Sequence, residues 1–139
     1  MIKNINKTSL FRSPPLIILG GGVHQIPYIK YCKKNKIPTL IIDQNKNCSA
    51  KYYADYLLNI ATPNNESLTI FKAINNITKK LGILGVLVAG VELAILGTFI
   101  AKKFKTKSIG LLTAKRATNK ISRAIQFKRY DIPYANFEI

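Results

Sequence analysis

The sequence is poor in the residues that build metal centres and disulfide frameworks. Its 139 residues include one histidine, His24, and two cysteines, Cys32 and Cys48, which form no CxxC pair. Structural zinc sites need four ligands at short, regular spacings, and small secreted domains need dense cysteine pairs. We therefore expect no metal site in this chain and two reduced thiols, as is typical of a cytoplasmic protein.

Acidic residues are also scarce. The sequence has 6 Asp and Glu against 22 Lys and Arg, which gives a formal net charge of +16. A positive field of this size favours anionic partners such as nucleic acid, acidic membranes or phosphorylated metabolites. The lysines are not interleaved with the stacking aromatics and arginine clusters of a dedicated nucleic-acid-binding protein, so we expect no nucleic-acid partner. A basic interaction protein is kept as the third interpretation.

No segment has the full pattern of a membrane span or of a signal peptide. Residues 81–100 are apolar enough to cross a bilayer, but they contain four glycines and Glu92, and a carboxylate at mid-bilayer is costly. A buried parallel strand that leads into a helix has the same apolar length. The N-terminal residues are basic and then apolar, without a small-residue cleavage site before His24. We therefore expect no membrane partner and a cytoplasmic location.

Apolar runs of strand length alternate with helical patterns along most of the chain. The expected strands are residues 16–20, 39–42, 55–60, 83–90 and 107–110. The expected helices are residues 24–35, 67–80, 92–103 and 113–130. This order predicts an α/β fold with a doubly wound, mainly parallel five-stranded sheet and helices on both faces. We expect residues 1–14 to be a flexible lead-in and residues 15–112 to form the α/β domain. Residues 113–139 are expected to be a helical linker into further structure.

The strongest local motif is the glycine turn after the first expected strand. Gly20, Gly21 and Gly22 precede His24 and Gln25. Glycine lets a ligand approach the backbone closely, and the following helix start offers N–H groups to a carboxylate or phosphate. The alternative is a tight turn that needs these glycines only for its backbone conformation.

A dinucleotide-binding turn is the main rival interpretation of this motif. Its fingerprint needs a third glycine where Gln25 stands. Asp43, which ends the second expected strand, is placed either to hold a ribose or to cap the loop that follows it.

Glu92 is the only charged residue in its apolar segment. It follows the fourth expected strand, and ligands of open α/β sheets bind beyond the carboxyl ends of the strands. Glu92 is therefore expected to face the same crevice as His24 and Gln25. A charge placed to favour the start of the next helix is the alternative.

Three segments in this order resemble the N-terminal domain of ATP-grasp ligases, in the group of biotin carboxylase and the carbamoyl-phosphate-synthase-like proteins. They are residues 16–60, with the glycine turn, Pro27 and Asp43, then residues 86–95, and then residues 118–137. The resemblance covers nearly the whole chain from Leu16 onward. It implies a Rossmann-like pre-ATP-grasp domain that lacks the ATP-grasp lobes, so the isolated chain is not expected to catalyse.

The resemblance also implies a reaction and a set of site residues. ATP, with Mg²⁺, phosphorylates a carboxylate in the complete enzyme, and an amine or another nucleophile attacks the acyl phosphate. The small anionic substrate would be bound by Gly20, Gly21, Gly22, His24, Gln25 and Glu92. Lys120 would reach the nucleotide, although Asn119 stands where relatives often have Asp. The expected partners are the missing lobes, in the same or a separate chain, and the resemblance allows a homodimer. A small Rossmann-type nucleotide- or dinucleotide-binding module is the second interpretation.

Overall fold

The computed structural model describes residues 10–135, so most of the expected lead-in and the last four residues lie outside the described part. Its centre is a four-stranded sheet in the order β3-β2-β1-β4, in which all three neighbouring pairs are parallel. The strands are β1 (Leu16–Leu19), β2 (Thr39–Asp43), β3 (Tyr56–Asn59) and β4 (Gly85–Val88). Leu19 is in register with Ile42 on one side and Val88 on the other, so the carboxyl ends of the central strands reach one edge together.

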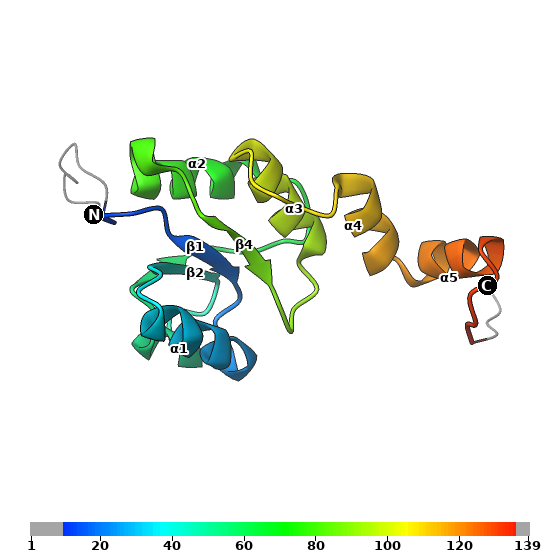
Figure 1. Ribbon diagram of the computed structural model, residues 1–139, viewed down its shortest axis with the longest axis horizontal. Coiled ribbons are helices and arrows are strands. Elements are labelled where there is room, and N and C mark those ends of the chain that lie inside the picture. The colour runs from blue at the N-terminus through cyan, green and yellow to red at the C-terminus, as the bar shows by residue number, and fades with distance from the viewer. Residues whose placement is uncertain (1–9, 136–139) are drawn as a thin grey trace.

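Helices cover both faces of this sheet, as Figure 1 shows. The α-helices are α1 (Ile26–Lys34), α2 (Leu68–Thr78), α3 (Ala94–Lys103), α4 (Leu111–Thr118) and α5 (Lys120–Arg129). Three short 3₁₀ helices are η1 (Val23–Gln25), η2 (Ser49–Tyr52) and η3 (Lys79–Leu81). Local chemistry fixes several ends: the Ser67 hydroxyl accepts from the Ile70 amide at 3.3 Å and caps α2, and proline stands in the first turn of α1.

Two apolar clusters hold the layers together. On one face Ile17 and Leu19 of β1 pack with Ile70 of α2 and Ile100 of α3. On the other face Ile18 packs with α1 and η2. Successive β1 residues thus alternate between the two faces, and since both faces are covered the strand is apolar throughout. Each fully buried Ile or Leu contributes about 1.5–3 kcal/mol to folding.

The expected α/β fold with a parallel sheet and helices on both faces is confirmed, but the prediction of a fifth strand is wrong. Residues 107–110 form no strand, and within the described residues β4 is therefore one of the two edge strands, with β3 as the other. Lys107, Ser108 and Ile109 line a cavity of about 410 Å³ beside Val86 and Val88 without pairing with them. With Ile109 59% exposed, this short segment has no buried apolar residue to fix it against β4.

Residues 81–100 form a strand followed by a separate helix, as the sequence analysis expected, but the strand is half-buried and not fully buried, because it lies at an edge of the sheet. They contain β4 and most of α3, with Glu92 in the turn between them. Gly97 allows α3 to lie close on β4, because a Cβ there would overlap with Val88. Within residues 10–135, no helix has the length and hydropathy needed to cross a bilayer.

The helical segment expected over residues 113–130 is two helices, which we call the C-terminal arm (residues 111–135). Asn119 has an extended backbone and separates α4 from α5. α4 packs against α3, whereas α5 contacts α4 and extends away from the sheet (Figure 1). No described residue of α5 is buried. The arm is therefore an extension of the domain without a core of its own.

Candidate functional site

The glycine turn leaves β1 at the carboxyl edge of the sheet and lies against the turn that follows β4. Gly20 has a φ of +87°, and a Cβ there would lie 2.9 Å from a methyl carbon of Val91. Its amide donates to the carbonyl of Ile42 at 2.9 Å, which continues the β1–β2 pairing. Gly20 is therefore required both by its backbone conformation and by the approach of the two turns.

Gly21 is buried and has a packing role. Its amide donates to Oδ2 of Asp43 at 2.6 Å, and its carbonyl accepts from the amide of Ala50 at 2.8 Å. A Cβ on Gly21 would overlap with Sγ of Cys48. Gly21 does not have a positive φ, and its Cα faces the protein, so the need for a small residue in this packing explains the glycine.

Asp43 caps the loops at this edge. Besides Gly21, it accepts from the amide of Asn45, through Oδ1 at 2.7 Å. Each carboxylate oxygen has a backbone partner, so Asp43 caps these loops, as the loop-capping alternative expected.

Gln25 ties the two turns together. Its side chain is 2% exposed, and Nε2 donates to the carbonyl of Ala89, directly after β4. A Cβ on Gly22 would lie 3.3 Å from Oε1 of Gln25, and one on Gly90 would lie 3.4 Å from Nε2. Gln25 therefore fixes the shape of this edge from inside. A dinucleotide-binding turn has its third glycine at this position, and the Gln25 side chain fills the space that such a glycine would leave open.

Three of the predicted site residues lie on the exposed side of these turns: Gly22, His24 and Glu92. We call these three residues the rim. Gly90 has a φ of +67°, and a Cβ there would lie 3.0 Å from Cβ of His24, so the turn after β4 packs against η1. Within residues 10–135, neither the His24 nor the Glu92 side chain has a hydrogen-bond or ion-pair partner. The structure thus brings the predicted residues of both turns to one edge, three exposed and three buried.

Lys120 lies elsewhere, on the C-terminal arm. It is the first residue of α5, which Asn119 caps by accepting from the amide of Ser122 at 2.8 Å. Asn119 therefore supplies the N-terminal cap of α5 through its side-chain oxygen. Lys120 is exposed beside Arg123 and Phe127 at a shallow cavity of about 300 Å³. Its position is separate from the rim, as Figure 1 shows for α5 and the sheet.

The two thiols are buried and unpaired with each other, and neither is activated. Burial raises the pKa of Cys48, and the neighbouring Asp43 raises it further. Burial, followed by Asp55, likewise raises the pKa of Cys32. A raised pKa leaves less thiolate at neutral pH, so these groups are poor nucleophiles. In the part of the chain that the structure describes, no three His, Cys, Asp or Glu side chains are grouped to hold a metal ion.

Sequence reasoning missed the link between Asp43 and Gly21 and the role of Gln25 as a tie. A usable signal existed for the first. Neighbouring parallel strands end at the same edge, so an Asp at the end of β2 lies beside the turn that leaves β1. Nothing in the sequence marks Ala89, whose backbone carbonyl is the partner of Gln25.

No protein-family model matches the sequence, and no curated protein is similar to it. Solved structures share the fold. Phosphoribosylglycinamide synthetase from Anaerococcus prevotii has 20% identity and a TM-score of 0.68 over 86% of this chain and 29% of its own. An ADP complex of N5-carboxyaminoimidazole ribonucleotide synthetase has 14% identity and a TM-score of 0.68 over 94% and 32%. The Staphylococcus aureus N5-carboxyaminoimidazole synthetase, also with ADP, has 15% identity and a TM-score of 0.62 over 89% and 31%. The chain spans about a third of the length of these proteins.

Proposed function

We propose that this chain is the N-terminal, substrate-side domain of an ATP-grasp ligase and does not catalyse by itself. One observation carries the proposal: the glycine turn and the turn after β4 meet at the carboxyl edge of the parallel sheet, which is where such folds bind ligands. The fold that this chain shares with about a third of each ligase supports it. The cytoplasmic location belongs to the same proposal.

The rim binds a small anionic substrate in this proposal. The exposed backbone at Gly22 lets a phosphate or carboxylate approach closely, and the His24 imidazole donates a hydrogen bond to it. The Glu92 carboxylate accepts from a hydroxyl or amine of the same molecule. Gly20, Gly21 and Gln25 contribute by fixing the shape of the turn. Two of the similar proteins are named phosphoribosylglycinamide synthetase and N5-carboxyaminoimidazole ribonucleotide synthetase, and these names support a phosphate on the substrate.

The reaction proposed for the complete enzyme is the phosphorylation of a carboxylate by ATP and the attack of an amine or similar nucleophile on the resulting acyl phosphate. The described residues do not form a site for Mg²⁺. We assign Mg²⁺ and most nucleotide contacts to lobes outside this chain, with Lys120 as the contribution of the arm. Ile121 and Ile125 are exposed and lie one helical turn apart on α5. Their apolar side chains would pack on those lobes, in the same or a separate chain. A homodimer is compatible with this arrangement.

Titration of the 139-residue chain with ribose 5-phosphate, followed by amide NMR, tests the proposal. We expect chemical-shift changes at residues 21–25 and 90–92, and weaker binding in Gly22→Val, because its side chain would occupy the anion position. ATP alone is expected to bind weakly or not at all. Binding of ribose 5-phosphate with no change at those amides would contradict the proposal.

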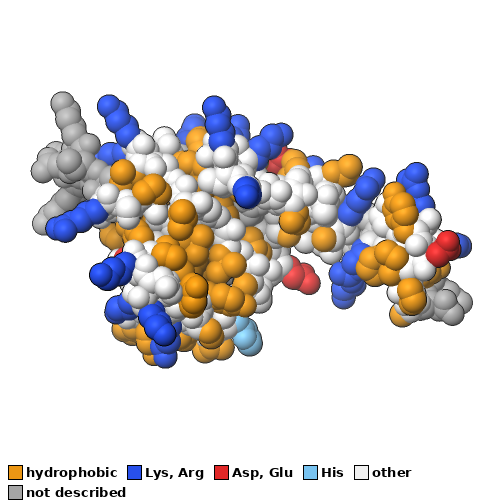
Figure 2. Space-filling model, viewed as in Figure 1, with side chains coloured by type: hydrophobic (Ala, Val, Ile, Leu, Met, Phe, Trp, Pro, Cys, Tyr) orange, Lys and Arg blue, Asp and Glu red, His pale blue; other side chains and the backbone are white. Residues whose placement is uncertain are grey.

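Two further ligands test the alternatives in the same experiment. Tight binding of NAD at the glycine turn would favour the dinucleotide-binding module. Salt-dependent binding of DNA without any response to ribose 5-phosphate would favour the basic interaction protein. In the view of Figure 2, Lys and Arg side chains are spread over the surface and do not gather into one patch, which disfavours the last outcome.

A further inference from the structure

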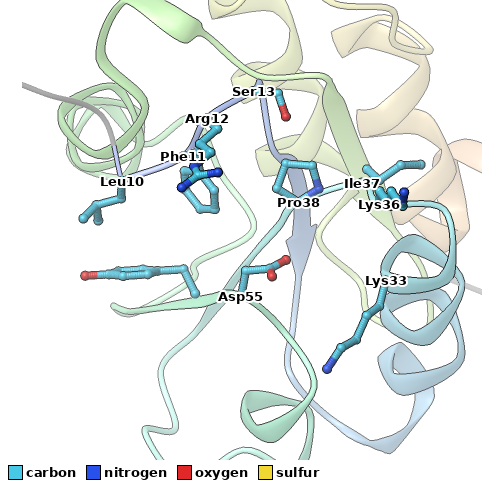
Figure 3. Close-up of a pocket in the computed structure, with 10 residues that line it drawn as sticks. Leu10, Phe11, Arg12, Ser13, Lys33, Lys36, Ile37, Pro38 and Asp55 are labelled. Carbon is cyan, nitrogen blue, oxygen red and sulfur yellow. The ribbon is translucent and has the colours of Figure 1, made fainter.

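A second cavity lies at the opposite edge of the sheet, where the strands begin. It has a volume of about 340 Å³ and is bounded by the segment before β1, the connection from α1 to β2, and the start of β3. Figure 3 shows the Asp55 carboxylate between Arg12 on one side and Lys33 on the other. The rim and this cavity are therefore separated by the length of the strands.

The cavity has an excess of positive charge. Arg12, Lys33 and Lys36 line it, and Asp55 is the only carboxylate among its lining residues. Oδ2 of Asp55 already accepts from the amide and the hydroxyl of Thr39, at 2.8 and 2.9 Å. Within residues 10–135, none of the three cations forms an ion pair with a carboxylate. Asp55 is thus the one negative charge beside three cations, and an anion in the cavity would form the ion pairs that these cations lack in the described part of the chain.

Lys36 has a backbone conformation that is less strained for glycine than for lysine. It follows the C-terminus of α1 with a φ of +57°, and the Ile37 amide donates back to the carbonyl of Cys32 at 2.9 Å. Helices commonly end with such a left-handed residue, and it is usually glycine because a Cβ is disfavoured there. A lysine in this position places a cation at the cavity at the expense of backbone strain.

The other wall of the cavity is apolar and aromatic. Phe11 is 9% exposed, and its ring meets the Tyr56 ring edge to face at a centroid distance of 6.2 Å. Pro38 and Ile37 continue this wall. Rings in this arrangement suit a planar group, whereas the cations suit a phosphate.

We propose that this cavity is a second ligand site, for a small molecule that carries a phosphate joined to a planar aromatic group, as a nucleoside monophosphate does. The phosphate lies among Arg12, Lys33 and Lys36, and the planar group lies on Tyr56 and Pro38. Such a site is independent of the rim and stands whether or not the chain is part of a ligase. The strands β1 and β2 run from one edge to the other, so a ligand in this cavity would lie apart from a substrate on the rim.

Titration of the 139-residue chain with AMP, monitored by amide NMR, tests this site. We expect shifts at residues 10–13, 36–37 and 55–56, and weaker binding of inorganic phosphate or adenosine alone, since each fills only half of the cavity. Lys33→Gln and Arg12→Gln are each expected to weaken AMP binding about five-fold by removing one charge-assisted contact.

Two variants separate a ligand site from general charge attraction. Lys34→Gln removes the same charge from the same helix outside the cavity and is expected to leave the affinity unchanged. Lys36→Gly is expected to weaken AMP binding while raising the melting temperature, because it relieves the strained φ. No shift at the cavity amides at millimolar AMP, or equal weakening by Lys33→Gln and Lys34→Gln, overturns the proposal. Shifts confined to residues 21–25 would also overturn it, and would be evidence on the rim alone.

Discussion

The carboxyl edge of the sheet and the C-terminal arm are held in opposite ways. At the edge, Gly21 and Gln25 are buried and hydrogen-bonded to residues of two other segments, and Cys48 leaves no room for a side chain at Gly21. In the arm, α5 has no buried residue and depends on α4 and one capping side chain. The edge therefore gets its shape from contacts within this chain, whereas the arm leaves apolar side chains exposed. Figure 2 shows hydrophobic side chains gathered on the projecting arm.

The largest expected effect is from Gly21→Val. The added side chain must displace Cys48 and the backbone around Asp43, and overpacking of this kind costs about 1–3 kcal/mol. Urea unfolding followed by circular dichroism would measure the loss. Gly22→Val is the matched control and should lower the free energy of unfolding by less than Gly21→Val does, because Gly22 is exposed with a φ of −77° and its Cβ would meet only Oε1 of Gln25, at 3.3 Å. Similar losses in both variants would remove the distinction between the buried and exposed halves of the turn.

Gln25→Leu is expected to have the next largest effect. It removes the hydrogen bond to Ala89 and leaves that carbonyl without its partner, at a cost of about 1–3 kcal/mol in a buried setting. The same urea experiment measures it, and amide exchange should speed up at residues 89–92. His24→Leu, one residue away and exposed, serves as the comparison and should unfold like the parent. A parent-like Gln25→Leu would show that the two turns meet without this tie.

Asn119→Ala tests the arm. Loss of the cap to Ser122 is expected to destabilise α5 by about 1 kcal/mol. The global unfolding transition should hardly move, since α5 buries nothing in the core, whereas hydrogen exchange in residues 120–129 should accelerate. Asn119→Asp, which keeps a capping oxygen, should exchange like the parent. A shift of the global transition by the full amount would mean that the arm folds as one unit with the sheet.

The smallest effect is expected where the arm meets the domain. Lys115 of α4 lies 3.6 Å from Glu66, and the side chains are 54% and 46% exposed. An exposed pair of this kind contributes about 0–1 kcal/mol. Glu66→Gln should therefore lower the melting temperature by about 4 °C at most, in low salt and in high salt. A larger, salt-sensitive loss would show that charge, more than the packing of α4 on α3, holds the arm to the domain.

The parts of the fold that follow from apolar pattern were predictable. Residues 16–20 and 39–42 read as strands because both faces of β1 and β2 are covered, and the alternation with helices gave the parallel topology. Residues 107–110 misled because the alternation of strands and helices suggested a further strand there, although Ile109 is the only large apolar residue of the segment and is exposed. At the site, the glycines marked the turn, but a sequence does not distinguish a glycine that admits a ligand from one that admits Cys48. That difference depends on segments brought together only by folding.

The free edge of β4 has a consequence for handling the protein. A strand with an unpaired side exposes peptide groups that a strand of another molecule can engage, and within residues 10–135 β4 is such a strand. Mutual repulsion between copies of charge +16 opposes that contact. Dissolved salt weakens the repulsion, since its screening length falls to about 10 Å at 0.1 M. Concentrated solutions of this chain should therefore be clearest in dilute buffer and turn cloudy as salt is added.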